Sequence, residues 1–114
     1  MPLGCRLRST QEVDMKAVLG STVLAEAPTD ELVQIEGNWY FPPSSLTEGA
    51  FEKSPTAYRC PWKGDAQYWN VGLGEDTLPD GAWSYPDPIK ASFDRVGSDY
   101  SGYVAFDRKV KISE

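Results

Sequence analysis

The sequence of 114 residues contains no histidine. Histidine is the side chain best suited to act as a general base near neutral pH, and it is the commonest protein ligand for transition metals. Its absence excludes Ser-His-Asp and Cys-His catalytic arrangements and every metal site that needs an imidazole. Cysteine is scarce as well, with only Cys5 and Cys60 in the chain. We therefore expect no structural zinc and no structural disulfide.

Long apolar runs and clusters of positive charge are also missing. No stretch approaches the roughly 20 apolar residues that span a bilayer, and the N-terminal MPLGCRLRSTQEVD lacks the apolar segment of a signal peptide. The net charge is −6, and among eleven basic residues only Arg108 and Lys109 are adjacent. We expect a cytoplasmic protein that binds neither nucleic acid nor a membrane.

Recognised phosphate and metal motifs are absent too. There is no P-loop and no G-x-G-x-x-G. Gly20-Ser21 with Asp30-Glu31 has a faint similarity to a nucleotidyl-transfer fingerprint, but these pairs fall in a predicted turn and a predicted loop. Carboxylates can bind magnesium without other ligands, but most acidic candidates occupy predicted turns, where aspartate usually bonds to local backbone. We expect no cofactor and no metal; the acidic candidates are Asp65, Glu75, Asp76, Asp80 and Asp87.

The length of the chain and its many turn-forming residues are typical of one small β domain. Ten glycines and nine prolines divide it into short segments, which disfavours long helices. Residues 1–14 show no periodicity and are interpreted as a flexible N-terminal extension, and residues 15–114 as a single domain. The predicted fold class is mainly β: a small two-sheet, tent-like or barrel-like domain of seven or eight short strands with one or two short helices.

Local patterns predict the individual elements. Apolar segments 16–19 and 22–27 flank Gly20-Ser21, which favours a type II′ hairpin. Ser45 and Glu48 form a capping-box pattern for a short helix within residues 44–54. Asp87 and Pro88 are typical of a helix start before residues 89–96, with Gly97 at the end. Residues 74–81 are expected to form an acidic turn. Further strands are expected over 31–37, 38–41, 56–60, 63–73, 82–85, 103–106 and 110–112.

Aromatic residues are concentrated in the middle of the chain, where AYRCPWKGDAQYW occupies residues 57–69. In a strand Tyr68 and Trp69 must face opposite sides, whereas Trp83 and Tyr85 share one side. Aromatic rings can form the core and a seam between sheets. Partly exposed rings beside polar groups are instead typical of a small-molecule pocket. Cys60 has two interpretations, a nucleophile assisted by Lys63 or an inert buried cysteine.

Several sequence blocks resemble a known family. EGNWYFPP, YRCPWKGDAQYW, AWSYPDP and GYVAF, in this order and spacing, are similar to the bacterial domain of unknown function 427, which is also catalogued as nucleotidyltransferase-like. The resemblance covers residues 15–112 and implies a tent-like β fold, shared with methionine sulfoxide reductase B and the cereblon ligand-binding domain. Several relatives of that shape hold zinc through paired CxxC motifs, which this sequence lacks. The family blocks contain Glu36, Asn38, Tyr40, Cys60, Pro61, Trp62, Lys63, Gly64, Tyr68, Trp83, Tyr85 and Pro88.

We expect an aromatic cleft that binds a small flat or anionic molecule. Trp62 and Trp83 would stack on the ligand, and Lys63 would contact an anionic group. Glu36 or Asn38 would fix its orientation. The predicted ligand-binding residues are Glu36, Asn38, Tyr40, Trp62, Lys63, Tyr68, Trp83 and Tyr85.

Two alternatives remain open at this stage. One is an enzyme that performs redox chemistry or nucleotidyl transfer, with Cys60 and Lys63 as the catalytic candidates or with an acidic metal site. The other is a module for protein interaction or self-association. The expected oligomeric state is a monomer or a weak homodimer.

Overall fold

The computed structural model describes residues 14–114, and these residues form a mainly β structure, as the sequence predicts. The flexible extension expected over residues 1–14 lies, apart from Asp14, outside the described residues. No helix within residues 14–114 has the length and apolar character needed to cross a bilayer. The elements in chain order are β1 (Asp14–Leu19), β2 (Thr22–Pro28), η1 (Thr29–Glu31), β3 (Val33–Ile35), β4 (Asn38–Tyr40), η2 (Pro43–Ser45), β5 (Phe51–Cys60), β6 (Gly64–Leu73), β7 (Asp76–Ser84), α2 (Ala91–Val96), β8 (Val104–Phe106) and β9 (Lys111–Ser113).

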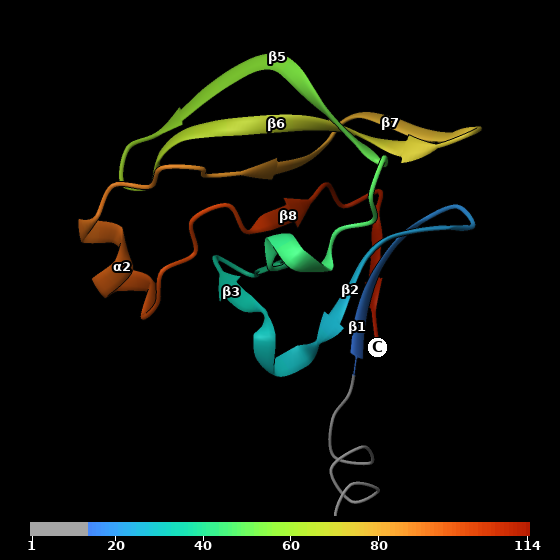
Figure 1. Ribbon diagram of the computed structural model, residues 1–114. Helices are drawn as coiled ribbons and strands as arrows, with labels where there is room; N and C mark the ends of the chain where they lie inside the picture. Colours follow the sequence, from blue (N-terminus) through green and yellow to red (C-terminus); the bar gives the residue numbers. More distant parts are fainter. Residues whose placement is uncertain (1–13) are drawn as a thin grey trace, which may run out of the picture.

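The strands form three hydrogen-bonded sheets rather than the two expected, and the described strands do not close into a barrel. The sheets have the orders β2-β1-β9, β3-β4 and β5-β6-β7-β8. Figure 1 shows the large sheet above, the β1–β2 hairpin and C-terminal strand to one side, and α2 at the other end. An isolated bridge between Phe41 and Val104 connects the β4 segment to the large sheet. Since β8 and β9 belong to different sheets, the C-terminal segment ties two of the sheets together.

The β1–β2 hairpin has the predicted two-residue turn. Leu19 pairs with Thr22, and Gly20 has a φ of 63°. Ser21 is not among the non-glycine residues with positive φ, so only the first turn position is left-handed, as in a type II′ turn. A Cβ at position 20 would also lie 2.5 Å from Asp76 Oδ1, so a larger residue there would require the Asp76 side chain to move.

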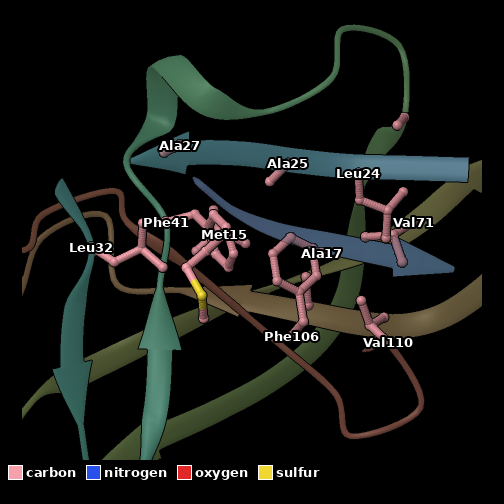
Figure 2. Close-up of a cluster of buried hydrophobic side chains, with 13 residues drawn as sticks. Met15, Ala17, Leu24, Ala25, Ala27, Leu32, Phe41, Val71, Phe106 and Val110 are labelled. Atoms are coloured by element: carbon pink, nitrogen blue, oxygen red, sulfur yellow. The ribbon is translucent and has the colours of Figure 1, made fainter. Parts of the chain in front are cut away.

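One hydrophobic core lies between the β1–β2 hairpin and the large sheet, and its side chains point toward one another in Figure 2. Phe41 is fully buried, and its ring meets the ring of Phe106 edge to face at a centroid distance of 5.6 Å. Trp69 packs against this core from β6, whereas its neighbour Tyr68 does not belong to it. The prediction that these adjacent rings face opposite sides of the sheet is confirmed.

A second core lies toward α2 and is built largely from tyrosines. Tyr100 is completely buried, and its ring meets those of Tyr40, Tyr85 and Phe93 at centroid distances of 6.3, 6.3 and 5.8 Å. Ser92, on α2, places its Oγ 2.7 Å from the Tyr100 hydroxyl. This core forms the packed support behind the aromatic site described below.

The helix expected around Ser45 and Glu48 is wrong. The hydroxyl of Ser45 donates backward to the Pro42 carbonyl at 2.7 Å, within the 3-10 turn η2. The amide of Thr47 donates to Leu24 on β2 at 2.8 Å, so the segment is held against a strand. Gly49 has a φ of 84°, which an α-helix does not allow, and β5 begins soon afterward at Phe51. Tertiary bonding to β2 therefore overrides the local capping pattern.

The acidic turn expected over residues 74–81 is also wrong, because the turn is limited to Gly74 and Glu75 and β7 begins at Asp76. Pro79 lies inside β7 at a register shift, where the strand bulges away from β6. At this bulge Asp80 has a φ of 52°, and its amide donates to Asn70 Oδ1 at 3.0 Å. Because Pro79 lies in the bulge, it does not have to donate a hydrogen bond to β6, and β7 continues beyond it.

The C-terminal helix ends where predicted and begins later. Gly97 has a φ of 96° and donates its amide to the Phe93 carbonyl at 2.7 Å, which is a left-handed helix end. Helix α2 starts at Ala91 rather than at residue 89. The amide of Ile89 instead donates to the Lys63 carbonyl at 2.9 Å, which attaches this segment to the β5–β6 turn.

The free energy of unfolding should rise between about pH 2 and pH 7, and we expect this rise to be smaller in Asp76→Asn than in wild type. The Asp76 carboxylate accepts bonds from the Ser21 amide, the Ser21 hydroxyl and the Thr22 hydroxyl at 3.2, 3.0 and 3.1 Å. These bonds lower the pKa of Asp76 below its ordinary 3.8. A depressed folded-state pKa means that the stabilisation is complete above the unfolded pKa and is lost as the pH falls through the folded pKa.

The measurement is urea unfolding of wild type and variant at several pH values. The difference between the two proteins should be largest at neutral pH and should shrink in acid below pH 3.8. A difference that stays constant with pH would refute this role of the Asp76 charge.

Candidate functional site

The structure brings all eight predicted ligand-binding residues to one surface pocket. The pocket has a volume of about 380 Å³. Its walls are formed by β4, β5, β6 and β7, by the β3–β4 turn and by the β5–β6 turn. The lining residues are Glu36, Asn38, Tyr40, Tyr58, Cys60, Pro61, Trp62, Lys63, Tyr68, Trp83 and Tyr85. Their convergence is a structural fact, whereas their role in binding stays a prediction.

The strand register explains why the rings converge. Tyr68 on β6 lies directly opposite Trp83 on β7, and the two ring centroids are 6.3 Å apart. Tyr85 follows Trp83 by two positions, and Cys60 follows Tyr58 by two positions on β5. Because side chains alternate along a strand, residues two apart share a face. These five side chains therefore lie on the pocket side of the large sheet.

Lys63 is the charged residue at the centre of the site. It ends the three-residue turn Pro61-Trp62-Lys63, which is closed by the pairing of Cys60 with Gly64. Lys63 is only 4% exposed, yet it lines the pocket. Its Nζ lies 5.0 Å from the Trp62 ring centroid and 5.1 Å from that of Tyr85. Aromatic faces stabilise a cation at such distances, so the rings partly replace the water lost on burial.

Glu36 supplies the anionic partner of this lysine. Lys63 Nζ donates to Glu36 Oε1 at 2.6 Å. Glu36 and Gly37 form the β3–β4 turn, with positive φ values of 54° and 85°. The hydrogen bond from Lys63 is the largest influence that lowers the pKa of Glu36. The pair joins two hairpins that are distant in sequence and sets one edge of the pocket.

Two tyrosine hydroxyls beside the pair stay protonated at neutral pH. Burial raises the pKa of Tyr40 to about 12, and burial also raises the pKa of Tyr85. The Trp83 indole donates to the Tyr40 hydroxyl at 3.0 Å, which fixes both rings. The Tyr85 hydroxyl and the Asn38 side chain make no hydrogen bond to any residue from 14 to 114. These two polar groups are therefore uncommitted.

Cys60 is buried, with a residue exposure of 5%. The other cysteine, Cys5, lies outside the described residues. The proposed catalytic roles of Cys60 and Lys63 stay predictions.

The acidic residues considered for magnesium are not brought together. Asp65 pairs with Arg59 at 3.0 Å, and Asp80 accepts from the Thr56 hydroxyl at 2.7 Å. Asp76 is committed to the β1–β2 turn. Over residues 14–114, no three side chains from His, Cys, Asp and Glu are placed to hold one metal ion.

Two other hollows differ in character from this pocket. One, of about 390 Å³, lies along β5, β6 and β7 around Phe51 and Pro79 and contains none of the predicted binding residues. Another, of about 290 Å³, adjoins the site behind Trp62 and is bordered by α2. There the Arg95 guanidinium lies 4.4 Å from the centroid of the Trp62 ring. Only the pocket around Lys63 combines several rings with a buried charge among the hollows described.

Three features of the site were not predicted. Tyr58 lines the pocket as well, and the signal for it is its position two residues before Cys60, a spacing that places both on one strand face. The stacking of Arg95 on Trp62 depends on the path of the chain after β7. The Glu36–Lys63 pair joins residues 27 positions apart, and no local pattern indicates it.

Fold and site together define a small mainly β domain with an aromatic surface pocket built around a buried lysine. The chain belongs to the family described as Domain of unknown function (DUF427), whose family model, NTP_transf_9, matches residues 7–114. The resemblance noted in the sequence is therefore confirmed. No curated protein matches the chain. The residues with a faint nucleotidyl-transfer pattern are separated in the structure, Gly20-Ser21 in a hairpin turn and Asp30-Glu31 in η1.

Proposed function

We propose that this domain binds a small flat organic molecule in the pocket around Lys63. The observation that supports the proposal is the convergence of aromatic side chains from four strands on one hollow that also contains a buried ammonium group. Its volume of about 380 Å³ falls within the range of ligand pockets.

The geometry modifies the expected binding mode. Trp62 already has Lys63 and Arg95 over its ring, at 5.0 and 4.4 Å from the centroid. We therefore assign stacking on the ligand to Trp83, Tyr68 and the half-exposed Tyr58, which form no cation–π contact with any cation of residues 14–114. Asn38 and the Tyr85 hydroxyl would orient the ligand, because both lack a hydrogen-bond partner within residues 14–114.

Thermal-shift screening of nucleosides and small metabolites tests the proposal. Stabilising compounds should bind Tyr58→Ala about 2- to 13-fold more weakly, since one aromatic contact contributes about 0.5–1.5 kcal/mol. Tyr58 is 51% exposed, so its truncation should leave the fold intact. Leu73→Ala is the matched control, because Leu73 is 42% exposed and lies outside the pocket.

The proposal fails if no compound stabilises the protein. It also fails if Tyr58→Ala and Leu73→Ala have equal effects on every compound that binds. Light scattering over a range of concentrations, on the same samples, measures the oligomeric state, for which we propose a monomer or a weak homodimer.

A further inference from the structure

We propose that Glu36 occupies the place of a ligand carboxylate, and that the pocket binds flat aromatic carboxylates which displace Glu36 from Lys63. This inference rests on the proposed function and specifies both its ligand class and its control. The argument depends on the unequal burial of the two partners, on the backbone at Glu36 and on the walls beside the ion pair.

The two members of the ion pair are buried to very different extents. The side chain of Lys63 is 6% exposed and that of Glu36 is 56% exposed. A buried ammonium without an anion is strongly unfavourable, whereas a half-exposed carboxylate can return to water at little cost. Lys63 therefore needs an anion at all times, but that anion need not be Glu36. The exchangeable member of the pair is the glutamate.

The backbone supports a role for the Glu36 side chain beyond turn formation. Glu36 has a φ of 54° at the first position of a two-residue hairpin turn. Asparagine, aspartate and glycine are the residues favoured there, because they tolerate a left-handed conformation. Strained non-glycine residues cluster at functional sites, where the side chain compensates for the local cost. Here the compensating feature is the 2.6 Å contact with Lys63.

The surroundings of the lysine match one negative charge attached to a flat ring. Lys63 Nζ has three N–H donors, of which Glu36 accepts one. The rings of Tyr68 and Trp83 stand in the same pocket, and Asn38 offers a further uncommitted donor. A cationic ligand in the pocket would be repelled by Lys63, and a second cation, Arg95, lies behind Trp62 in the adjoining hollow. A monoanion replaces Glu36 charge for charge, which a phosphate dianion does not.

Matched acids and amides test this inference. Benzoate and indole-3-acetate are titrated against wild type and Glu36→Gln, alongside benzamide and indole-3-acetamide, with binding followed by NMR shifts of pocket residues. The acids should bind the variant about tenfold more tightly, because they no longer compete with the Glu36 carboxylate for the ammonium group of Lys63. The amides should change by less than about twofold, since they carry no charge.

Glu31→Gln is the control, because it removes the same charge from an exposed residue in η1, outside the pocket. Glu36→Asn is the second variant, since asparagine suits the left-handed backbone and keeps the test valid if the glutamine variant unfolds. Lys63→Met should remove the preference for acids over amides.

The outcomes separate this inference from the proposed function. If amides and acids bind but the Glu36 variants leave the acid-to-amide ratio unchanged, displacement is overturned and the aromatic pocket stands. If acids bind neither wild type nor the Glu36 variants while neutral ligands do, the ligand class is overturned. If nothing binds in the pocket, both proposals are overturned.

Discussion

Replacing Tyr100 with alanine is expected to destabilise the domain by about 3–5 kcal/mol, the usual cost of removing a buried aromatic ring. Tyr100 is fully buried, and its ring contacts those of Tyr40, Tyr85 and Phe93. The free energy of unfolding of a small domain is only about 5–15 kcal/mol, so the expected loss is a large fraction of the total. Because Tyr40 and Tyr85 also line the pocket, any ligand binding should be lost together with stability.

Tyr100→Phe separates packing from hydrogen bonding. It keeps the ring and removes only the hydroxyl, which lies 2.7 Å from Ser92 Oγ. Ser92 retains its bond to the Ile89 carbonyl at 2.6 Å, so the expected cost is about 1 kcal/mol. Urea unfolding of both variants measures the difference. Equal losses would show that the hydroxyl, rather than the ring, supports this core.

Gly72→Ala is expected to lower the free energy of unfolding by about 3–5 kcal/mol, because the new Cβ would overlap neighbouring atoms and the backbone would be strained. Gly72 has a φ of 131°, and a Cβ there would overlap the Asp76 carbonyl oxygen and lie 2.6 Å from Thr77 Cα. Both obstacles are backbone atoms of β7, so no side-chain rotation relieves them. The residue thus permits the close approach of β6 and β7 beside their turn.

Gly74→Ala provides the control within the same hairpin. Gly74 has a φ of 62°, but a Cβ there meets nothing within 4 Å. Its cost should be limited to the left-handed backbone, about 1–2 kcal/mol. Thermal and urea unfolding of both variants checks the order, and a loss at position 74 as large as that at 72 would contradict the steric account.

Features determined by adjacent residues were predictable from the sequence, and features determined by distant partners were not. The turn at Gly20 and the helix end at Gly97 follow from backbone preferences of glycine. The capping pattern at Ser45 failed because Thr47 is bonded to a strand more than twenty residues earlier. Local propensity is a weak prior wherever such tertiary bonds compete.

The same distinction applies to the site. Alternation along the strand placed Trp83 and Tyr85 on one side, and the family blocks added the remaining positions, whereas the pairing of Tyr68 with Trp83 came only from the strand register. Neither source indicates that the buried Lys63 would meet Glu36, since the β3–β4 turn reaches it only through the assembled fold. The composition of the pocket was therefore predictable, while its internal ion pair was not.

The pairing of β1 with β9 has a consequence for synthesis of the protein. Lys16, in the first described strand, is paired with Ser113, in the last. During translation β1 and β2 emerge early. The other edge of β1 can pair with β9 only after nearly the whole described chain has left the ribosome. Contacts between such distant positions slow folding and leave strand edges unprotected in the interval. The nascent chain would thus pass through a stage in which that edge of β1 has no β9 to pair with.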